Sequence, residues 1–215
     1  MKSRKKNRSK PLGQSLVEFT LMLPILLIII SGLVEFGFLL NFYLDLVDTS
    51  REVARNASDD DPVHDETGAF YDDPLNDPEP KGFYSRAFDA VMHELTKARQ
   101  ISLDQGNNDD MVLSIFTIKD GAIFARYPGS YNLICDQGGE KGWRLYCNQE
   151  SRFDNARVQD MLNELTLDAP NTGIVLVEIF YNYNLVMGLP WVEAFIGNPV
   201  TLHAYSIMPN RSAAP

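Results

Sequence analysis

Residues 13–44, GQSLVEFTLMLPILLIIISGLVEFGFLLNFYL, form the stretch that decides the fold of this chain. No charged residue lies between Glu18 and Glu35, and the apolar character continues past Glu35 to Leu44. Counted from Leu16, the stretch is longer than the ~20 residues that a helix needs to cross a bilayer core about 30 Å thick. It therefore predicts one membrane-spanning helix.

Charge is distributed unevenly along the 215 residues, whose net charge is −10. Six of the 19 basic residues come before the apolar stretch, and none of the 29 acidic residues precedes Glu18. The six are Lys2, Arg4, Lys5, Lys6, Arg8 and Lys10. Because basic flanks stay in the cytoplasm, we expect a single-pass protein of the cytoplasmic (inner) membrane with its C-terminal part outside.

A cleaved secretory signal peptide is the competing interpretation, since it also has a basic start and an apolar centre. The apolar stretch is too long for that, Glu18 stands at its very start, and no clear small-x-small cleavage site follows it. A helical composition also continues through Ser50 to Arg55. A lasting anchor is favoured.

Several short motifs follow one another in this region. Residues 13–19 read GQSLVEF, followed by Leu23-Pro24, then Glu35-Phe36-Gly37, and then residues 51–55, REVAR. In these features the chain resembles the TadE-like family, which comprises minor pilin or pseudopilin components of tight-adherence pili. Beyond Asn56 the resemblance is loose, and only residues 200–208 look like the last strand that is usual in that family.

The resemblance implies cleavage by a prepilin-type peptidase after Gly13, which would leave Gln14 as the new N-terminus. Glu18, followed by Phe19, would then set the register between subunits, because an acid at the edge of the hydrocarbon needs a partner. In pilins that partner is the α-amine of a neighbouring subunit. The implied partners are the bilayer, the peptidase, other pilin subunits and the pilus assembly platform.

Three points on this helix stay open. An N-terminal glutamine can cyclise, and a cyclised Gln14 would lack the amine that Glu18 needs. Pro24 is a candidate helix kink, although membrane helices also tolerate proline without one. Glu35 could pair with a neighbour or face lipid headgroups.

The composition divides the chain into four parts. Residues 1–13 are a basic cytoplasmic leader, 14–57 the membrane helix and its extension, 58–82 an acidic Pro-rich loop, and 83–215 an extracytoplasmic domain. Within that domain the patterns predict helices at 83–99 and 155–165 and strands at 111–118, 122–127, 174–183 and 200–208. We expect an α+β fold in which a small antiparallel sheet packs against helices.

The two cysteines, Cys135 and Cys147, bracket a glycine-containing loop. Outside the cytoplasm a disulfide between them is favoured over two thiols. A zinc site is disfavoured because no CxxC or HxxxH spacing accompanies them.

The acidic loop offers a weak alternative, a calcium site at Asp59, Asp60 and Asp61. The EF-hand spacing with its central glycine and terminal glutamate is missing, so we expect no metal and no other cofactor.

Other classes of function find little support in the sequence. The acidic character disfavours nucleic acid as a partner. His64, His93 and His203 are far apart, and no catalytic motif is present, so we expect no enzyme activity. The leading hypothesis is a minor pilin or pseudopilin, the alternative an uncleaved, membrane-anchored binding or adhesion module.

One apolar cluster has two interpretations. Residues 187–196 contain Met187, Trp191 and Phe195 between two predicted strands. They could cap the open edge of the sheet or fill the core, or they could form a subunit contact or a patch at the membrane interface.

Overall fold

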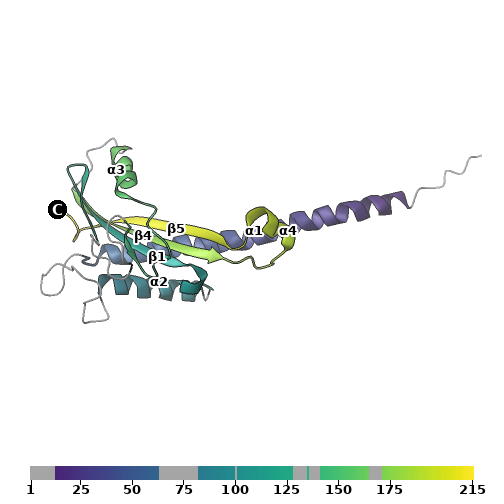
Figure 1. The fold of residues 1–215 in the computed structure, drawn as a ribbon, viewed down its shortest axis with the longest axis horizontal. Coiled ribbons are helices and arrows are strands. Elements are labelled where there is room, and N and C mark those ends of the chain that lie inside the picture. Colours follow the sequence, from purple (N-terminus) through teal and green to yellow (C-terminus); the bar gives the residue numbers. More distant parts are fainter. Residues whose placement is uncertain (1–12, 63–81, 100, 128–134, 136–140, 165–170) are drawn as a thin grey trace, which may run out of the picture.

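The computed structural model of the protein describes residues 13–62, 82–99, 101–127, 135, 141–164 and 171–215. A single long helix, α1 (Gln14–Ser58), projects from a smaller body of strands and short helices (Figure 1). The leader before Gly13 and most of the acidic loop lie outside the described residues. The long apolar helix and the α+β body agree with the expected fold class.

The body is built on an antiparallel sheet. Its strands are β1 (Asp110–Lys119), β2 (Ala122–Tyr127), β4 (Thr172–Tyr183) and β5 (Val200–Asn210), in the order β2-β1-β4-β5, with the short β3 (Trp143–Arg144) also paired to β1. Asp120 and Gly121 both have positive φ, which lets them form the tight β1–β2 hairpin turn that the sequence predicted.

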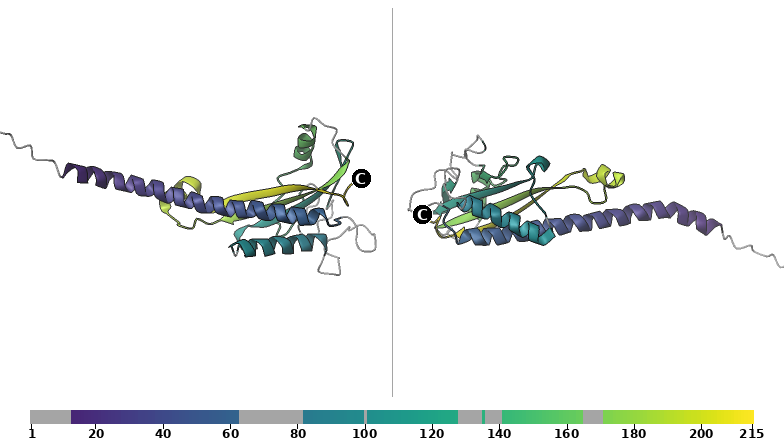
Figure 2. Two further views of the ribbon diagram at one scale, coloured as in Figure 1. Left: turned by 180° about the vertical axis from the view of Figure 1, so that it is seen from behind. Right: turned by 90° about the horizontal axis from the view of Figure 1, so that it is seen from below.

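Two helices cover one face of the sheet. The second half of α1 packs along β4 and β5, and α2 (Phe83–Arg99) lies beside it (Figure 2). Alternate residues of β4 point into this core, namely Val175, Val177 and Ile179. α1 is therefore both the projecting helix and a structural element of the body.

The opposite face carries a smaller cluster under α3 (Asn155–Glu164). Phe116 and Leu176 from the sheet meet Phe153 and Val158 there. The sheet is thus covered unequally, with the larger core on the side of α1.

The structure contains three elements that the sequence patterns missed. A 3₁₀ turn, η1 (Gln105–Asn107), precedes β1, and β3 has only two residues. The apolar connection between β4 and β5 contains a helix, α4 (Pro190–Ile196), which begins with a proline at its first turn. Each of these elements has seven residues or fewer, which is too short for a periodic repeat of apolar residues to be recognised.

Candidate functional site

The first half of α1 projects from the body, and all residues from Ser15 to Ile30 are exposed. α1 is long and apolar enough to cross a membrane. The helix continues through Pro24, with helical residues on both sides. This exposed apolar surface needs lipid or another protein to cover it, which agrees with single-pass anchoring by α1.

The residues predicted for processing and register occupy the first turns of this helix. Gly13 is its N-cap and Gln14 its first residue. Glu18 and Phe19 follow within two turns, and both are exposed. Gly13 has the right-handed helical conformation, and a Cβ added to it would meet nothing within 4 Å. The fold itself does not require glycine at position 13.

Where α1 enters the body, the Glu35 carboxylate is almost completely buried, with 1% of its surface exposed. It accepts hydrogen bonds from the Tyr183 hydroxyl (2.6 Å), the Val186 N–H (2.8 Å) and the Met187 N–H (2.9 Å). One side chain of α1 thereby fixes the end of β4 and the start of the loop that leads to α4. We call this set of four residues the Glu35 clasp.

One turn earlier on α1, Ser31 makes a second connection to the body. The Trp191 indole N–H of α4 donates to the Ser31 hydroxyl (3.0 Å), which in turn donates to the Ile28 carbonyl (2.9 Å). Trp191 is consequently held against α1 by a hydrogen bond as well as by packing. Buried polar groups need such partners, and here each finds one within the chain.

Aromatic rings extend the clasp along α1. Phe42, two turns beyond Glu35, stacks on Tyr181 with the ring centroids 6.1 Å apart and packs at a tilt on Tyr183 with the centroids 5.1 Å apart. Burial, followed by the bond to Glu35, raises the pKa of Tyr183 well above its usual range. The hydroxyl therefore stays protonated and acts as the donor to Glu35.

The C-terminal end of α1 is fixed by the last strand. The Asn210 side-chain amide, which is fully buried, donates to the carbonyls of Ala57 and Asp60, both at 2.9 Å. It also accepts from the Ala213 N–H (2.9 Å). The Ala57 carbonyl is one that the helix end leaves without an intrahelical partner, and Asp60 lies just beyond that end. The body is thus fastened to α1 at both ends of their contact.

The three aspartates proposed as a weak cation site lie just after α1. The Asp60 carboxylate is paired with the Arg86 guanidinium of α2 at 2.7 Å. No group of three or more acidic, histidine or cysteine side chains that could hold a metal ion occurs within the described ranges.

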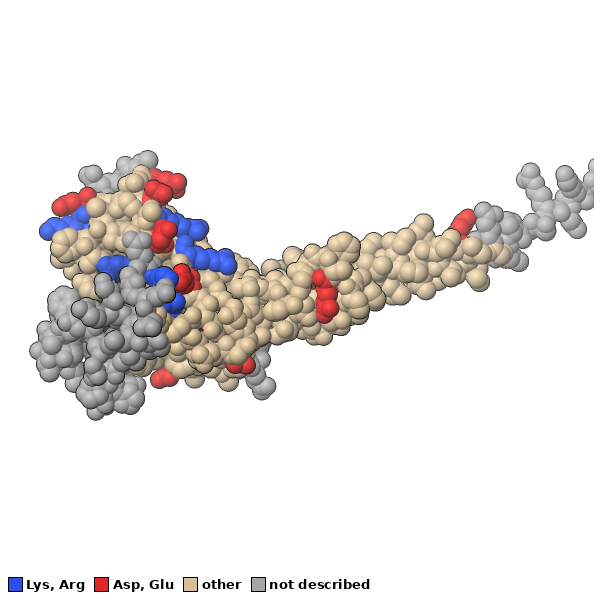
Figure 3. Space-filling model, viewed as in Figure 1, with Lys and Arg blue, Asp and Glu red and all other residues tan. Residues whose placement is uncertain are grey.

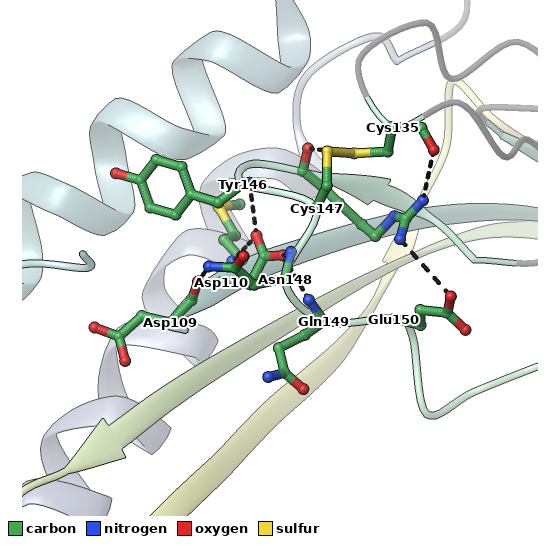
Figure 4. The surroundings of a disulfide bond; sticks show 10 residues. Asp109, Asp110, Cys135, Tyr146, Cys147, Asn148, Gln149 and Glu150 are labelled. Carbon is green, nitrogen blue, oxygen red and sulfur yellow. Dashed lines mark hydrogen bonds and ion pairs between the residues drawn. A yellow bond between two sulfur atoms is a disulfide. The ribbon is translucent and has the colours of Figure 1, made fainter. Parts of the chain in front are cut away.

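The disulfide between Cys135 and Cys147 is present, as the sequence favoured (Figure 4). Beside it, the buried Asp110 carboxylate accepts from the backbone N–H groups of Tyr146 (2.9 Å), Asn148 (2.8 Å) and Gln149 (2.9 Å). The residues on both sides of Cys147 are therefore held to the start of β1. The disulfide and Asp110 therefore have a structural role in this part of the body.

Another buried carboxylate, Glu178 on β4, lies on the face of the sheet opposite α1. It accepts from the Ser151 hydroxyl and the Arg152 N–H (3.0 Å) and lies 3.0 Å from the His203 Nε2. The carboxylate stands between the hydroxyl and the imidazole. A base-activated serine instead needs the imidazole next to its hydroxyl, so this cluster has the wrong order for catalysis.

Sequence reasoning left the role of Glu35 open and did not find its partners. The one available signal was an acid inside an otherwise apolar stretch, which predicts some partner but not which one. Tyr183, Val186 and Met187 are about 150 residues away in the chain, as separations of 148, 151 and 152 show. Only the folded structure brings them together.

The comparisons with known proteins agree with the resemblance noted in the sequence. Neither a curated protein nor a solved structure gives a match to this chain. Residues 13–55, which run from the N-cap of α1 almost to its end, match the family model described as TadE-like protein, so this segment of the chain is similar to that family.

Proposed function

We propose that this protein is a minor pilin or pseudopilin that takes part in assembling a tight-adherence pilus or a related secretion system. A prepilin-type peptidase cleaves it after Gly13, and the new N-terminus at Gln14 lies at the cytoplasmic edge of the bilayer. Its role is structural, without catalysis or a cofactor. The observation that carries the proposal is the TadE-like match over residues 13–55.

The exposure of the first turns of α1 supports processing. A peptidase must reach the bond between Gly13 and Gln14, and these residues start the helix at the end far from the body (Figure 1). Among the described residues nothing packs against the site of the missing Cβ of Gly13, so they give no structural reason for a glycine there. Recognition by a peptidase supplies a reason for a glycine there.

The same exposure supports a role for Glu18 in register. A carboxylate at the edge of the hydrocarbon is costly unless it is paired. In the proposed assembly, its partner is the α-amine of Gln14 in a neighbouring subunit. The pair forms only when two helices have the correct axial offset, so it selects one register.

Processing is tested by co-expressing the full chain with a prepilin-type peptidase and measuring its mass. We expect loss of residues 1–13 from the natural chain and no loss from Gly13→Glu, while Gly37→Ala, a control at another open helix position, is cleaved normally. Normal cleavage of Gly13→Glu, or no cleavage of the natural chain, would contradict the proposal.

The alternative is an uncleaved anchored module for binding or adhesion. It would keep the basic leader in the mature protein and would not depend on Glu18. A mature protein in the native host that retains Lys2 to Lys10 therefore favours this second function.

A further inference from the structure

The short helix α4 presents an apolar surface beside the projecting part of α1. Phe195 has 85% of its surface exposed and Trp191 has 40%. Val186, Met187 and Ile196 are also exposed. These five residues form what we call the α4 patch. Such a patch is too apolar to be left in water without a reason.

Between the α4 patch and α1 lies an apolar groove of about 270 Å³. On the α1 side it is lined by Ile28, Gly32, Phe36 and the buried Glu35, and on the α4 side by Trp191, Val192, Phe195 and Ile196. The groove and the patch are thus continuous with the apolar surface of the membrane-crossing helix. Among the described residues, Figure 3 shows no lysine or arginine on the narrow half of the molecule in this view, where the charged side chains that can be seen are acidic.

The position of the groove along α1 places it at the depth of lipid chains. A hydrocarbon core about 30 Å thick takes about 20 residues of helix, so a span that starts at Glu18 ends near Phe38. Ile28 to Phe36 then lie in the leaflet nearest the body. α4, which packs against them, must lie at the same depth.

Three donors in this region have partners within the protein. The Trp191 N–H is bonded to Ser31, and the Val186 and Met187 N–H groups are bonded to Glu35. In lipid an unsatisfied N–H is far more costly than in water, so internal bonding of this kind is what a membrane-inserted loop requires.

The one acidic residue of α4 lies outside the patch. Glu193 accepts a hydrogen bond from the Asn198 side-chain amide (2.9 Å). Residues two apart on a helix face different sides, so Glu193 points away from the side of Phe195.

We infer that the α4 patch and the groove are a lipid-binding surface that inserts into the leaflet next to the body. The protein would then be held in the bilayer by α1 and by α4, which fixes both its depth and its rotation about α1. Insertion of α4 needs α1 to span the membrane but does not depend on processing or on assembly into a fibre.

Trp191 itself provides the test, because the chain has only one other tryptophan, Trp143, which is buried in the core. The full chain is reconstituted in phosphatidylethanolamine–phosphatidylglycerol vesicles that contain lipids brominated on the acyl chain. In the Trp143→Phe variant, we expect strong quenching of the remaining Trp191 emission. In the Trp191→Phe variant, Trp143 should not be quenched.

If Trp143→Phe does not fold, the difference between the natural chain and Trp191→Phe gives the Trp191 signal. A Phe19→Trp variant without the two natural tryptophans reports insertion of α1 separately. The inference is overturned if the tryptophan introduced by Phe19→Trp is quenched and Trp191 is not. Trp191 would then lie in water or be covered by a second protein chain.

A charge on the α4 patch gives a second readout. Phe195→Lys should reduce the quenching of Trp191, because an ammonium group is expelled from hydrocarbon. Phe124→Lys is the matched control, since Phe124 is 68% exposed on β2 in the body, and it should leave the quenching unchanged. Equal quenching in both variants would contradict insertion of α4.

Discussion

At the scale of single residues, the most informative side chain is Glu35. It lies in an otherwise apolar stretch, yet it accepts three hydrogen bonds from residues that are distant in the chain. A buried carboxylate that keeps all its donors stabilises the arrangement in which α1 contacts the end of β4 and the loop after it. Any other arrangement would leave these donors without their acceptor and would cost free energy. Glu35 therefore sets how the body sits on α1.

Replacing Glu35 by glutamine tests this role. The amide would place an N–H group where one of the three donors now points, and we expect unfolding of the body to become easier by about 1–3 kcal/mol. The measurement is denaturant unfolding of the full chain in detergent micelles. Glu164→Gln, at an exposed position of α3, is the control and should leave the midpoint unchanged.

For Glu18, by contrast, we expect no contribution to the stability of the body. Because it is exposed on the projecting half of α1, Glu18→Gln should not change the unfolding of the body. It should instead reduce recovery of the protein in assembled fibres while leaving cleavage after Gly13 intact. Normal incorporation of Glu18→Gln into fibres would exclude the proposed register pair.

At the scale of elements, α1 and β5 depend on each other. Asn210, at the end of β5, supplies the two donors that close the C-terminal end of α1. Cys135–Cys147 and Asp110 brace the loop beside β1. The last strand and the long helix thus form one unit although they lie at opposite ends of the sequence.

Asn210→Ala leaves the carbonyls of Ala57 and Asp60 without these donors. We expect the body to lose about 1–3 kcal/mol of stability, with faster hydrogen exchange in the last turn of α1. Asn163→Ala, at an exposed position of α3, serves as the comparison. Unchanged exchange at the end of α1 in Asn210→Ala would show that the strand does not cap it.

The disulfide closes a loop with a sequence separation of 12 residues. In the chain-entropy model such a loop contributes about 3 kcal/mol, so the double variant Cys135→Ser, Cys147→Ser should unfold at a lower denaturant concentration. After reduction of the disulfide, the natural chain should unfold at the same denaturant concentration as that variant. A natural chain whose unfolding midpoint is insensitive to reductant would contradict this contribution.

Elements with strong patterns could be predicted, and contacts between distant segments could not. The apolar run of α1, the Asp120-Gly121 hairpin and the strand at 174–183 carry periodic or turn signals in the local sequence. α4 is too short for its pattern to distinguish helix from loop. The partners of Glu35 and Asn210 lie about 150 residues away, and no local signal encodes such a distance.

At the scale of the whole molecule, the structure is a long helix with a firmly attached body at one end (Figure 1). Bonds at Ser31, Glu35 and Asn210 restrain the body along the whole of its contact with α1. When the body cannot rotate relative to α1, the axial position of α1 in a fibre also fixes the position of the body surface that contacts other subunits. This property suits a component of an assembled fibre.

The central claim, that the protein is processed as a pilin, is tested most directly by its intact mass and N-terminal peptide after recovery from its native membrane. We predict a mature chain that starts at Gln14, and the same spectrum shows whether its α-amine is free, methylated or cyclised. A mature chain that still carries Lys2 to Gly13 would contradict the claim and would leave an uncleaved, membrane-anchored module as the better description.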